Sequence, residues 1–146
     1  MLPTQVHGGS FIAGGTTGTG LDGSALAVRE NMIVVTVQYR LGVLGFLKIE
    51  SLGLTGNYGF KDVIMALSSS SPLFTAAPTK LTLLLAAFIK KEIVAFGGSS
   101  KVTLAGHSSG AEMIKALLVT PSAVSLFSRA ILHSAPLNYR SEERRV

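Results

Sequence analysis

One short segment limits what the chain can fold into more than any other: a glycine-flanked serine between an apolar run and an amphipathic stretch. Residues 106–110 read Gly-His-Ser-Ser-Gly. Residues 102–105 before them are typical of a strand, and the stretch after them, to about Thr120, is typical of a helix that Pro121 ends. So sharp a turn strains the serine backbone and needs glycines beside it. The pattern G-x-S-x-G in this context predicts that Ser108 is a nucleophile, and an ordinary serine–glycine turn is the alternative.

Two further stretches predict strands. Residues 32–39 are rich in β-branched side chains without strict alternation, which is typical of a strand covered on both faces of a parallel sheet. Residues 130–133 indicate another short strand. Because strands and helical stretches alternate along the chain, we expect an α/β fold with a mostly parallel sheet flanked by helices.

Three stretches predict helices from the spacing of their apolar residues. The first begins at Asn57 and should stop at the serine run 68–71, since Pro72 and Pro78 follow. The second runs to Phe96, and the third follows Ser108. The predicted buried faces are Phe60, Val63, Ile64 and Leu67 in the first, Ile89, Ile93 and Phe96 in the second, and Ala111, Ile114, Leu117 and Leu118 in the third.

A glycine-rich stretch, residues 8–23, is predicted to be a loop, because it has too many permissive backbone positions for a regular element. It opens with Gly8 and Gly9 after His7, a pattern that resembles the loop whose N–H groups stabilise the oxyanion of a tetrahedral intermediate. Glycine suits such a loop because the substrate carbonyl must approach the backbone to about 3 Å. The predicted oxyanion-hole donors are the N–H groups of Gly8, Gly9 and Ser109.

Further blocks of the sequence, taken in order, resemble those of the type-B carboxylesterases, a cholinesterase-like family of the α/β-hydrolase superfamily. They cover residues 8–15, 22–26, 34–47, 56–62, 95–98, 102–111 and 129–134. The resemblance implies that residues 1–146 form a partial carboxylesterase domain with a partial α/β-hydrolase fold, incomplete at the N-terminus and lacking the C-terminal half. It also implies a serine esterase that forms an acyl-enzyme with a small-molecule ester and needs no cofactor. Complete members of the family are often secreted.

The chain departs from the pattern of this family in several places. Residues 2–6 are less apolar than the strand that enters the glycine loop in the family, which predicts a weakly anchored loop. Residues 68–90 stand where the family has one uninterrupted helix. We interpret them as an atypical insert and hypothesise that a retained intron or a mistaken exon join supplies it. Residues 141–146 match no block of the family.

The departure that bears most on activity concerns the partners of the serine. Triads in this fold follow the chain order serine, acid, histidine. After Ser108 the sequence has one histidine, His133, and one carboxylate between the two, Glu112. Glu112 is a helical turn from Ser108 and cannot also orient a histidine across the sheet, and the family usually has glutamine at the position of His133. We therefore expect the acid and the histidine of the triad to be missing and the chain to be inactive alone. The alternatives are a non-catalytic cholinesterase-like protein, against which Ser108 argues because that branch typically lacks the serine, and a non-functional truncated product.

Neither a metal site nor a nucleotide site is predicted. His7 is expected to shape its loop, His107 to pack beside the turn and His133 to end a strand, and no two of them combine metal-ligand spacing with a carboxylate. Residues 18–23 spell G-x-G-x-x-G, but the preceding strand that a dinucleotide motif requires is not predicted. Residues 97–101 lack the four-residue gap of a phosphate-binding loop.

Composition excludes other classes of protein. With 47% hydrophobic and 14% charged residues among 146, the chain suits one domain with a buried core and not a disordered segment. The formal net charge of +5 is scattered, and the arginines of residues 140–145 have Glu142 and Glu143 between them, so no nucleic-acid partner is expected. The apolar run 81–89 is shorter than the roughly 20 residues of a membrane span, and the first residues lack a signal-peptide pattern. There is no cysteine, and the cellular location and oligomeric state stay open.

Overall fold

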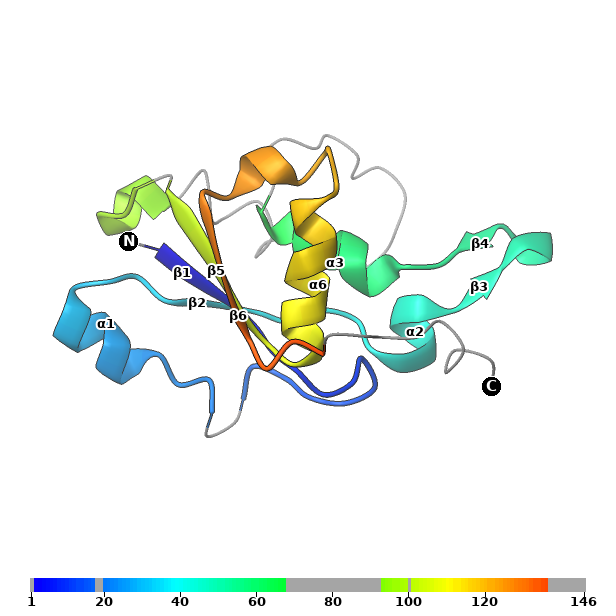
Figure 1. Cartoon of the computed structure of the whole chain (residues 1–146), viewed down its shortest axis with the longest axis horizontal. Coiled ribbons are helices and arrows are strands. Elements are labelled where there is room, and N and C mark those ends of the chain that lie inside the picture. The colour runs from blue at the N-terminus through cyan, green and yellow to red at the C-terminus, as the bar shows by residue number, and fades with distance from the viewer. Residues whose placement is uncertain (1, 18–19, 68–92, 100, 137–146) are drawn as a thin grey trace.

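The computed structural model describes residues 2–17, 20–67, 93–99 and 101–136. Its centre is a four-stranded sheet with the strand order β2-β1-β5-β6, in which every pair is parallel (Figure 1). The strands are β1 (Leu2–Val6), β2 (Val35–Val37), β5 (Val102–His107) and β6 (Arg129–His133). A short antiparallel pair, β3 (Lys48–Ile49) and β4 (Leu54–Thr55), lies outside this sheet. The predicted mostly parallel α/β sheet is confirmed.

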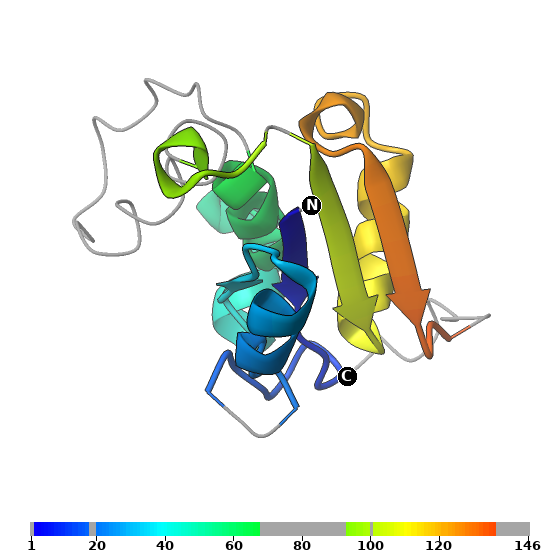
Figure 2. The same ribbon diagram turned by 90° about the vertical axis from the view of Figure 1, so that its left-hand side faces the viewer.

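Helices fill the connections between the strands. In Figure 2, α6 lies behind β5 and β6, whereas α1 lies nearer the viewer. The α-helices are α1 (Ser24–Glu30), α2 (Gly42–Phe46), α3 (Tyr58–Leu67) and α6 (Ser109–Leu118), and the 3-10 turns are η1 (Glu50–Leu52), η2 (Ile93–Phe96) and η3 (Val124–Leu126). Residues 8–23 form no helix or strand where they are described, as predicted.

The buried stripe of α6 joins the sheet to the core. Ala111, Ile114 and Leu117 have no exposed surface and Met113 is also buried, so this helix covers β5 with a continuous apolar face. Leu118 was expected in the same stripe, but it is 43% exposed. By angle it lies within the stripe, about 40° from Ile114, but it is the last residue of α6.

Of the other two predicted helix faces, one is confirmed and one is not. In α3, Val63 and Leu67 are buried, and Phe60 and Ile64 pack against the core as partly buried neighbours, which confirms the predicted face. In η2, Ile93 is buried but Phe96 is 61% exposed, contrary to the prediction. Residues three apart in a 3-10 helix lie on the same side, so the geometry of η2 does not explain the exposure of Phe96. The proposed insert at 68–90, the predicted helix stop at 68–71, Ile89 and the arginines of 140–145 lie outside the described residues.

Strand β2 is shorter than the predicted strand 32–39. Its pairing with β1 begins where Thr4 meets Val35, directly after Pro3, a residue without an N–H to donate. Val35 and Thr36 are half-buried and Val37 is buried. Within β2, therefore, only Val37 is fully buried, and the predicted burial on both faces is incomplete.

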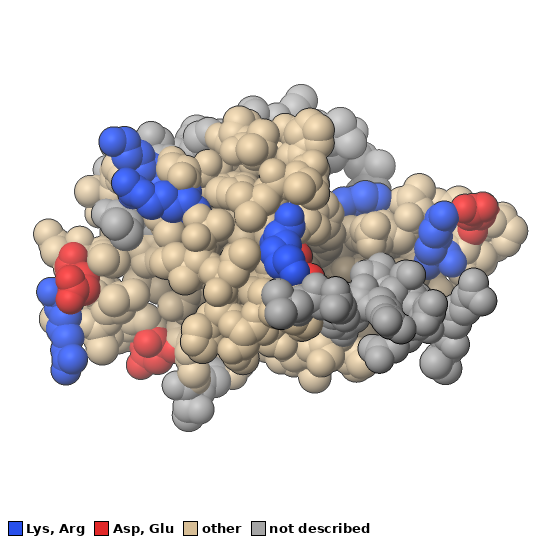
Figure 3. Space-filling model, viewed as in Figure 1, with Lys and Arg blue, Asp and Glu red and all other residues tan. Residues whose placement is uncertain are grey.

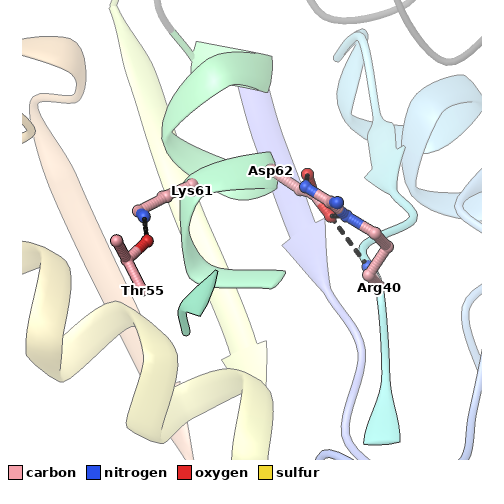
Figure 4. Close-up of polar contacts among 4 residues, drawn as sticks. All are labelled: Arg40, Thr55, Lys61 and Asp62. Atoms are coloured by element: carbon pink, nitrogen blue, oxygen red, sulfur yellow. Dashed lines mark hydrogen bonds and ion pairs between the residues drawn. The ribbon is translucent and has the colours of Figure 1, made fainter. Parts of the chain in front are cut away.

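An ion pair ties the segment after β2 to α3 (Figure 4). The Arg40 Nε donates to Asp62 Oδ2 at 2.8 Å and a terminal guanidinium nitrogen donates to Oδ1 at 2.7 Å, while the Arg40 backbone N–H also donates to Oδ2 at 3.0 Å. These hydrogen bonds raise the pKa of Arg40. On the same helix, Lys61 Nζ donates to Thr55 Oγ1 at 2.8 Å and so holds β4 against α3. The two contacts fix the position of α3 from both sides.

Charged side chains are spread over the face drawn in Figure 3, where several blue groups lie next to red ones. Ion pairs join Lys48 to Glu50 and Lys115 to Glu112. Of the helices in the described part of the chain, none is long and apolar enough to cross a membrane.

Candidate active site

Ser108 stands at the junction of β5 and α6 in a strained backbone conformation. Its φ is 54° and its ψ is −121°. Its own N–H donates to the carbonyl of His133 at 3.0 Å, and its carbonyl accepts from Glu112 N at 3.0 Å as the first hydrogen bond of α6. The strained residue is therefore fixed from β6 on one side and from α6 on the other.

The glycines on either side of the turn are required by its packing. A Cβ on Gly106 would lie 2.6 Å from the carbonyl of Gly110, and a Cβ on Gly110 would lie 2.2 Å from the carbonyl oxygen of Val6. Both distances are far below van der Waals contact. The sequence predicts that side chains are kept out of this turn. The reason is that the backbones of β1, β5 and α6 are in direct contact there.

The glycine loop passes directly beside the serine. A Cβ on Gly8 would lie 3.1 Å from Ser108 Cβ and 2.8 Å from the carbonyl oxygen of His107. Gly9 has φ +120°, and its contacts are to Ala13, whose amide N–H donates to the Gly9 carbonyl at 3.0 Å. The fold therefore brings Gly8, Ser108 and Ser109 together, while the contacts given for Gly9 lie within its own loop.

Ser109 is the first residue of α6, and its N–H is one of the groups at a helix start that find no partner inside the helix. Its side chain is 1% exposed, and in the described structure its hydroxyl has no hydrogen-bond partner. The amide of Ser109 is therefore left without a partner inside α6.

The entry to the glycine loop is held by Tyr39, a residue that sequence reasoning did not assign to the site. Tyr39 Oη donates to the carbonyl of His7 at 2.8 Å, and the two rings stack with centroids 4.4 Å apart. Burial raises the pKa of Tyr39. His7 also makes a 2.8 Å hydrogen bond from Nδ1 to Gly8 O.

These contacts contradict the prediction that the glycine loop is weakly anchored. Strand β1 pairs with β2 on one side and with β5 on the other, and Thr4 and Val6 are buried in it. Pairing on two sides and the bond from Tyr39 fix the strand despite its polar residues. The position of Tyr39 just past β2 was the available signal, because parallel strands end at the same edge of a sheet.

The remaining candidates lie around the turn without reaching the serine hydroxyl. In the described structure no hydrogen bond joins Ser108 Oγ to an imidazole or a carboxylate. Glu112 is paired with Lys115 at 2.9 Å, and His133 ends β6 with its ring next to that of His107. The carboxylate of Glu112 thus forms an ion pair with a residue of its own helix.

An open hollow of about 480 Å³ lies at the start of α1 and has Leu21, Asp22, Gly23 and Val34 in its lining, away from Ser108. It borders the G-x-G-x-x-G sequence, and among the described residues from 8 to 23 there is no strand. Hydrogen bonds from the side chain and backbone of Ser24 lower the pKa of Asp22. The carboxylate of Asp22 thus accepts a hydrogen bond from the backbone N–H of Ser24, the first residue of α1.

The fold and the turn together define a class. A parallel sheet whose strand passes through a strained serine straight into a helix, with a glycine loop from the neighbouring strand beside it, is the arrangement of an α/β hydrolase. The sequence model of the carboxylesterase family matches residues 4–69 and 82–144. The chain belongs to the carboxylesterase family.

Individual relatives agree with this family. Carboxylesterase 3 of Homo sapiens is 41% identical over 130 residues, which are 88% of the chain and 19% of that protein. Cocaine esterase of Homo sapiens is 36% identical over 136 residues, 91% of the chain and 21% of that protein. Neuroligin-2 of Mus musculus is 37% identical over 130 residues, 88% of the chain and 13% of that protein. The chain thus spans about a fifth or less of the length of these relatives.

Proposed function

We propose that this chain is the nucleophile-bearing part of a carboxylic ester hydrolase, with Ser108 as the nucleophile. The observation that carries the proposal is the strained backbone of Ser108 with Gly8 packed beside it. Strain of this kind persists only where the surrounding structure enforces it, and it is a feature of active sites. Membership of the carboxylesterase family and the similarity to carboxylesterase 3 support an ester as the substrate.

In the proposed reaction, Ser108 Oγ attacks the carbonyl carbon of a small-molecule ester and gives its proton to a histidine. The oxyanion of the tetrahedral intermediate accepts hydrogen bonds from the backbone N–H groups of Gly8, Gly9 and Ser109. The bond to the alcohol oxygen then breaks, the alcohol leaves with the proton from the histidine, and an acyl-enzyme remains on Ser108. Water then attacks the carbonyl carbon of the acyl-enzyme and gives a proton to the histidine. The bond to Ser108 Oγ breaks, the proton returns to Oγ, and the carboxylic acid leaves. The chemistry needs no cofactor.

We further propose that the histidine and the acid of this reaction are not among residues 1–146, so that the chain alone has no useful turnover. Two observations support this. Glu112 is held by Lys115, and in the described structure Ser108 Oγ is not hydrogen-bonded to His107 or His133. A hydrolase site without its triad keeps at most about 10³–10⁴-fold acceleration over water. The same observations favour a non-catalytic protein as the second candidate.

A chimera separates the two candidates. This chain, without residues 70–81 that the family model leaves unmatched, would replace the corresponding segment of full-length human carboxylesterase 3. The expected result is hydrolysis of p-nitrophenyl acetate that Ser108→Ala reduces by about 10⁴-fold or more, because the nucleophile is lost. Ser122→Ala, an exposed change far from the turn in the sequence, serves as the matched control. A folded chimera that keeps its activity without Ser108 would refute the assignment.

The atypical segment 68–90 remains a proposal of a separate kind. The break in the family match, residues 70–81, falls inside it and supports the hypothesis of a retained intron or a mistaken exon join. Sequencing of mature transcripts is the test. Transcripts that mostly lack the segment are expected, and its presence in most of them would overturn the hypothesis.

A further inference from the structure

The sheet register places two histidines side by side although they lie far apart in the sequence. His107 ends β5 and His133 ends β6, and the two are Cα partners in the parallel pairing of these strands. Partners in neighbouring strands point their side chains to the same face of the sheet. The ring centroids are 5.5 Å apart with an angle of 35° between the planes, and both residues are exposed.

This separation is close to the one that a shared metal ion requires. A Zn–N bond is about 2.0–2.1 Å, so with about 1.2 Å from the nitrogen to the ring centre, two imidazoles at a tetrahedral angle have centres about 5.2 Å apart. The observed 5.5 Å differs from this by a few tenths of an ångström. Exposed rings can make that adjustment by small rotations of their side chains.

The neighbours of the rings indicate which nitrogens are available. The Nδ1 of His107 lies against Gly8, 3.3 Å from where a Cβ of that residue would stand. The Nδ1 of His133 is 3.5 Å from Ser134 Oγ. Metal-ligating histidines commonly hydrogen-bond through their second ring nitrogen, and Ser134 provides such a contact for His133. The Nε2 atoms of both rings are left for a ligand.

We propose that His107 and His133 bind one divalent transition-metal ion of the kind that imidazole prefers, such as Zn²⁺, through their Nε2 atoms, with water in the other positions. Within the described ranges, no group of three or more His, Cys, Asp or Glu side chains could hold a metal, so the site rests on two protein ligands and is open to solvent. Glu112, the nearest carboxylate in the sequence, is held by Lys115. The proposal does not depend on ester hydrolysis.

The test is a zinc titration of the full 146-residue chain without a histidine tag, at micromolar concentration, in competition with a chromophoric zinc indicator. One Zn²⁺ per chain is expected. His107→Ala and His133→Ala should each lower the affinity by about tenfold or more. His107→Cys should restore binding that His107→Ala loses, because a thiolate is also a zinc ligand.

Ser122→Ala, with its exposed side chain in the turn before η3, is the matched control and should bind zinc as the unmodified chain does. A far-UV circular dichroism spectrum of each variant establishes that it is folded. The proposal is overturned if the unmodified chain binds no more zinc than the double variant His107→Ala/His133→Ala. It is also overturned if both single variants bind as tightly as the unmodified chain, because the ligands would then lie elsewhere.

Discussion

At the scale of single residues, Ser108 has a strained backbone conformation. A non-glycine residue with φ 54° and ψ −121° costs about 1–3 kcal/mol. The cost is offset by the elements on each side, since Ser108 N is hydrogen-bonded to His133 O and α6 buries Ile114 and Leu117 completely. The position of the serine hydroxyl is therefore set by packing that surrounds it.

Tyr39 supports this site through a buried hydrogen bond, and its ionisation makes that support depend on pH. Tyr39→Phe removes the bond from Oη to His7 O, so at neutral pH we expect the free energy of unfolding to fall by about 1 kcal/mol. Burial raises the pKa of Tyr39 in the folded chain above its unfolded value of about 10. The unfolded chain therefore loses this proton first, and the stabilisation by Tyr39 is lost as the pH rises through the folded pKa.

Urea unfolding of the two proteins between about pH 7 and pH 11 measures this difference. The advantage of the unmodified chain over Tyr39→Phe should be constant below about pH 9 and should shrink above about pH 10. A difference that stays constant up to pH 11 would contradict the role given to burial of the hydroxyl.

At the scale of elements, the sequence predicts those features that depend on residues near one another in the chain. The face of α3 follows from the spacing of Val63 and Leu67, and the serine turn follows from the glycines at 106 and 110. Strand β5, however, extends two residues beyond the predicted 102–105. Its last residues are strand because Gly106 pairs with Val6 and Leu132, and His107 pairs with His133. Such pairing depends on distant segments, which a local pattern does not contain.

The same limit explains the parts of the site that were missed. Gly8 and Ser109 were predicted as neighbours of the serine from a sequence pattern, but Tyr39 makes its contact across the sheet, from the residues after β2 to the residue after β1. The side-by-side arrangement of His107 and His133 likewise follows from strand register. Leu118 and Phe96 were assigned to buried faces by spacing alone, and both are exposed.

The close approach of α6 to β1 can be tested at Gly110. Gly110→Ala places a Cβ 2.2 Å from Val6 O and 2.7 Å from His7 O, and backbone carbonyls cannot move aside as a flexible side chain would. We expect a loss of about 1–3 kcal/mol in the free energy of unfolding, even though alanine favours a helix. Gly20→Ala is the matched control, because no atom lies within 4 Å of its added Cβ.

Denaturant unfolding of both variants provides the measurement. A lower midpoint is expected for Gly110→Ala and little change for Gly20→Ala. Equal stability of the two variants would mean that strand and helix are not packed backbone to backbone at the turn.

At the scale of the whole molecule, the sheet has two outer strands, β2 and β6, with no further strand beside either in the described ranges. In β6, Ile131 is 55% exposed and Leu132 is 40% exposed. An exposed edge with apolar side chains promotes pairing with other chains. We therefore expect the chain to be poorly soluble when expressed by itself, and a soluble monomer with a cooperative thermal transition would show otherwise.

A charge at this edge should reduce the association. Ile131→Lys is expected to raise the soluble fraction on expression, because lysine on an edge strand opposes pairing between chains. Val28→Lys adds the same charge at an 83% exposed position on α1, outside the sheet, and should have a smaller effect. The measurement is the soluble fraction of each variant after centrifugation. An equal gain from both would attribute the effect to net charge and not to the edge of β6.

We infer that the fold makes Ser108 a nucleophile whose activating groups lie outside residues 1–146. Phosphonylation by a fluorophosphonate tests this inference, with intact mass spectrometry and peptide mapping of the chain alone and of the carboxylesterase 3 chimera. One adduct on Ser108 is expected in the chimera, and none in the chain alone over the same time. Labelling of the chain alone at the rate of the chimera, or an adduct at any residue other than Ser108, would contradict it.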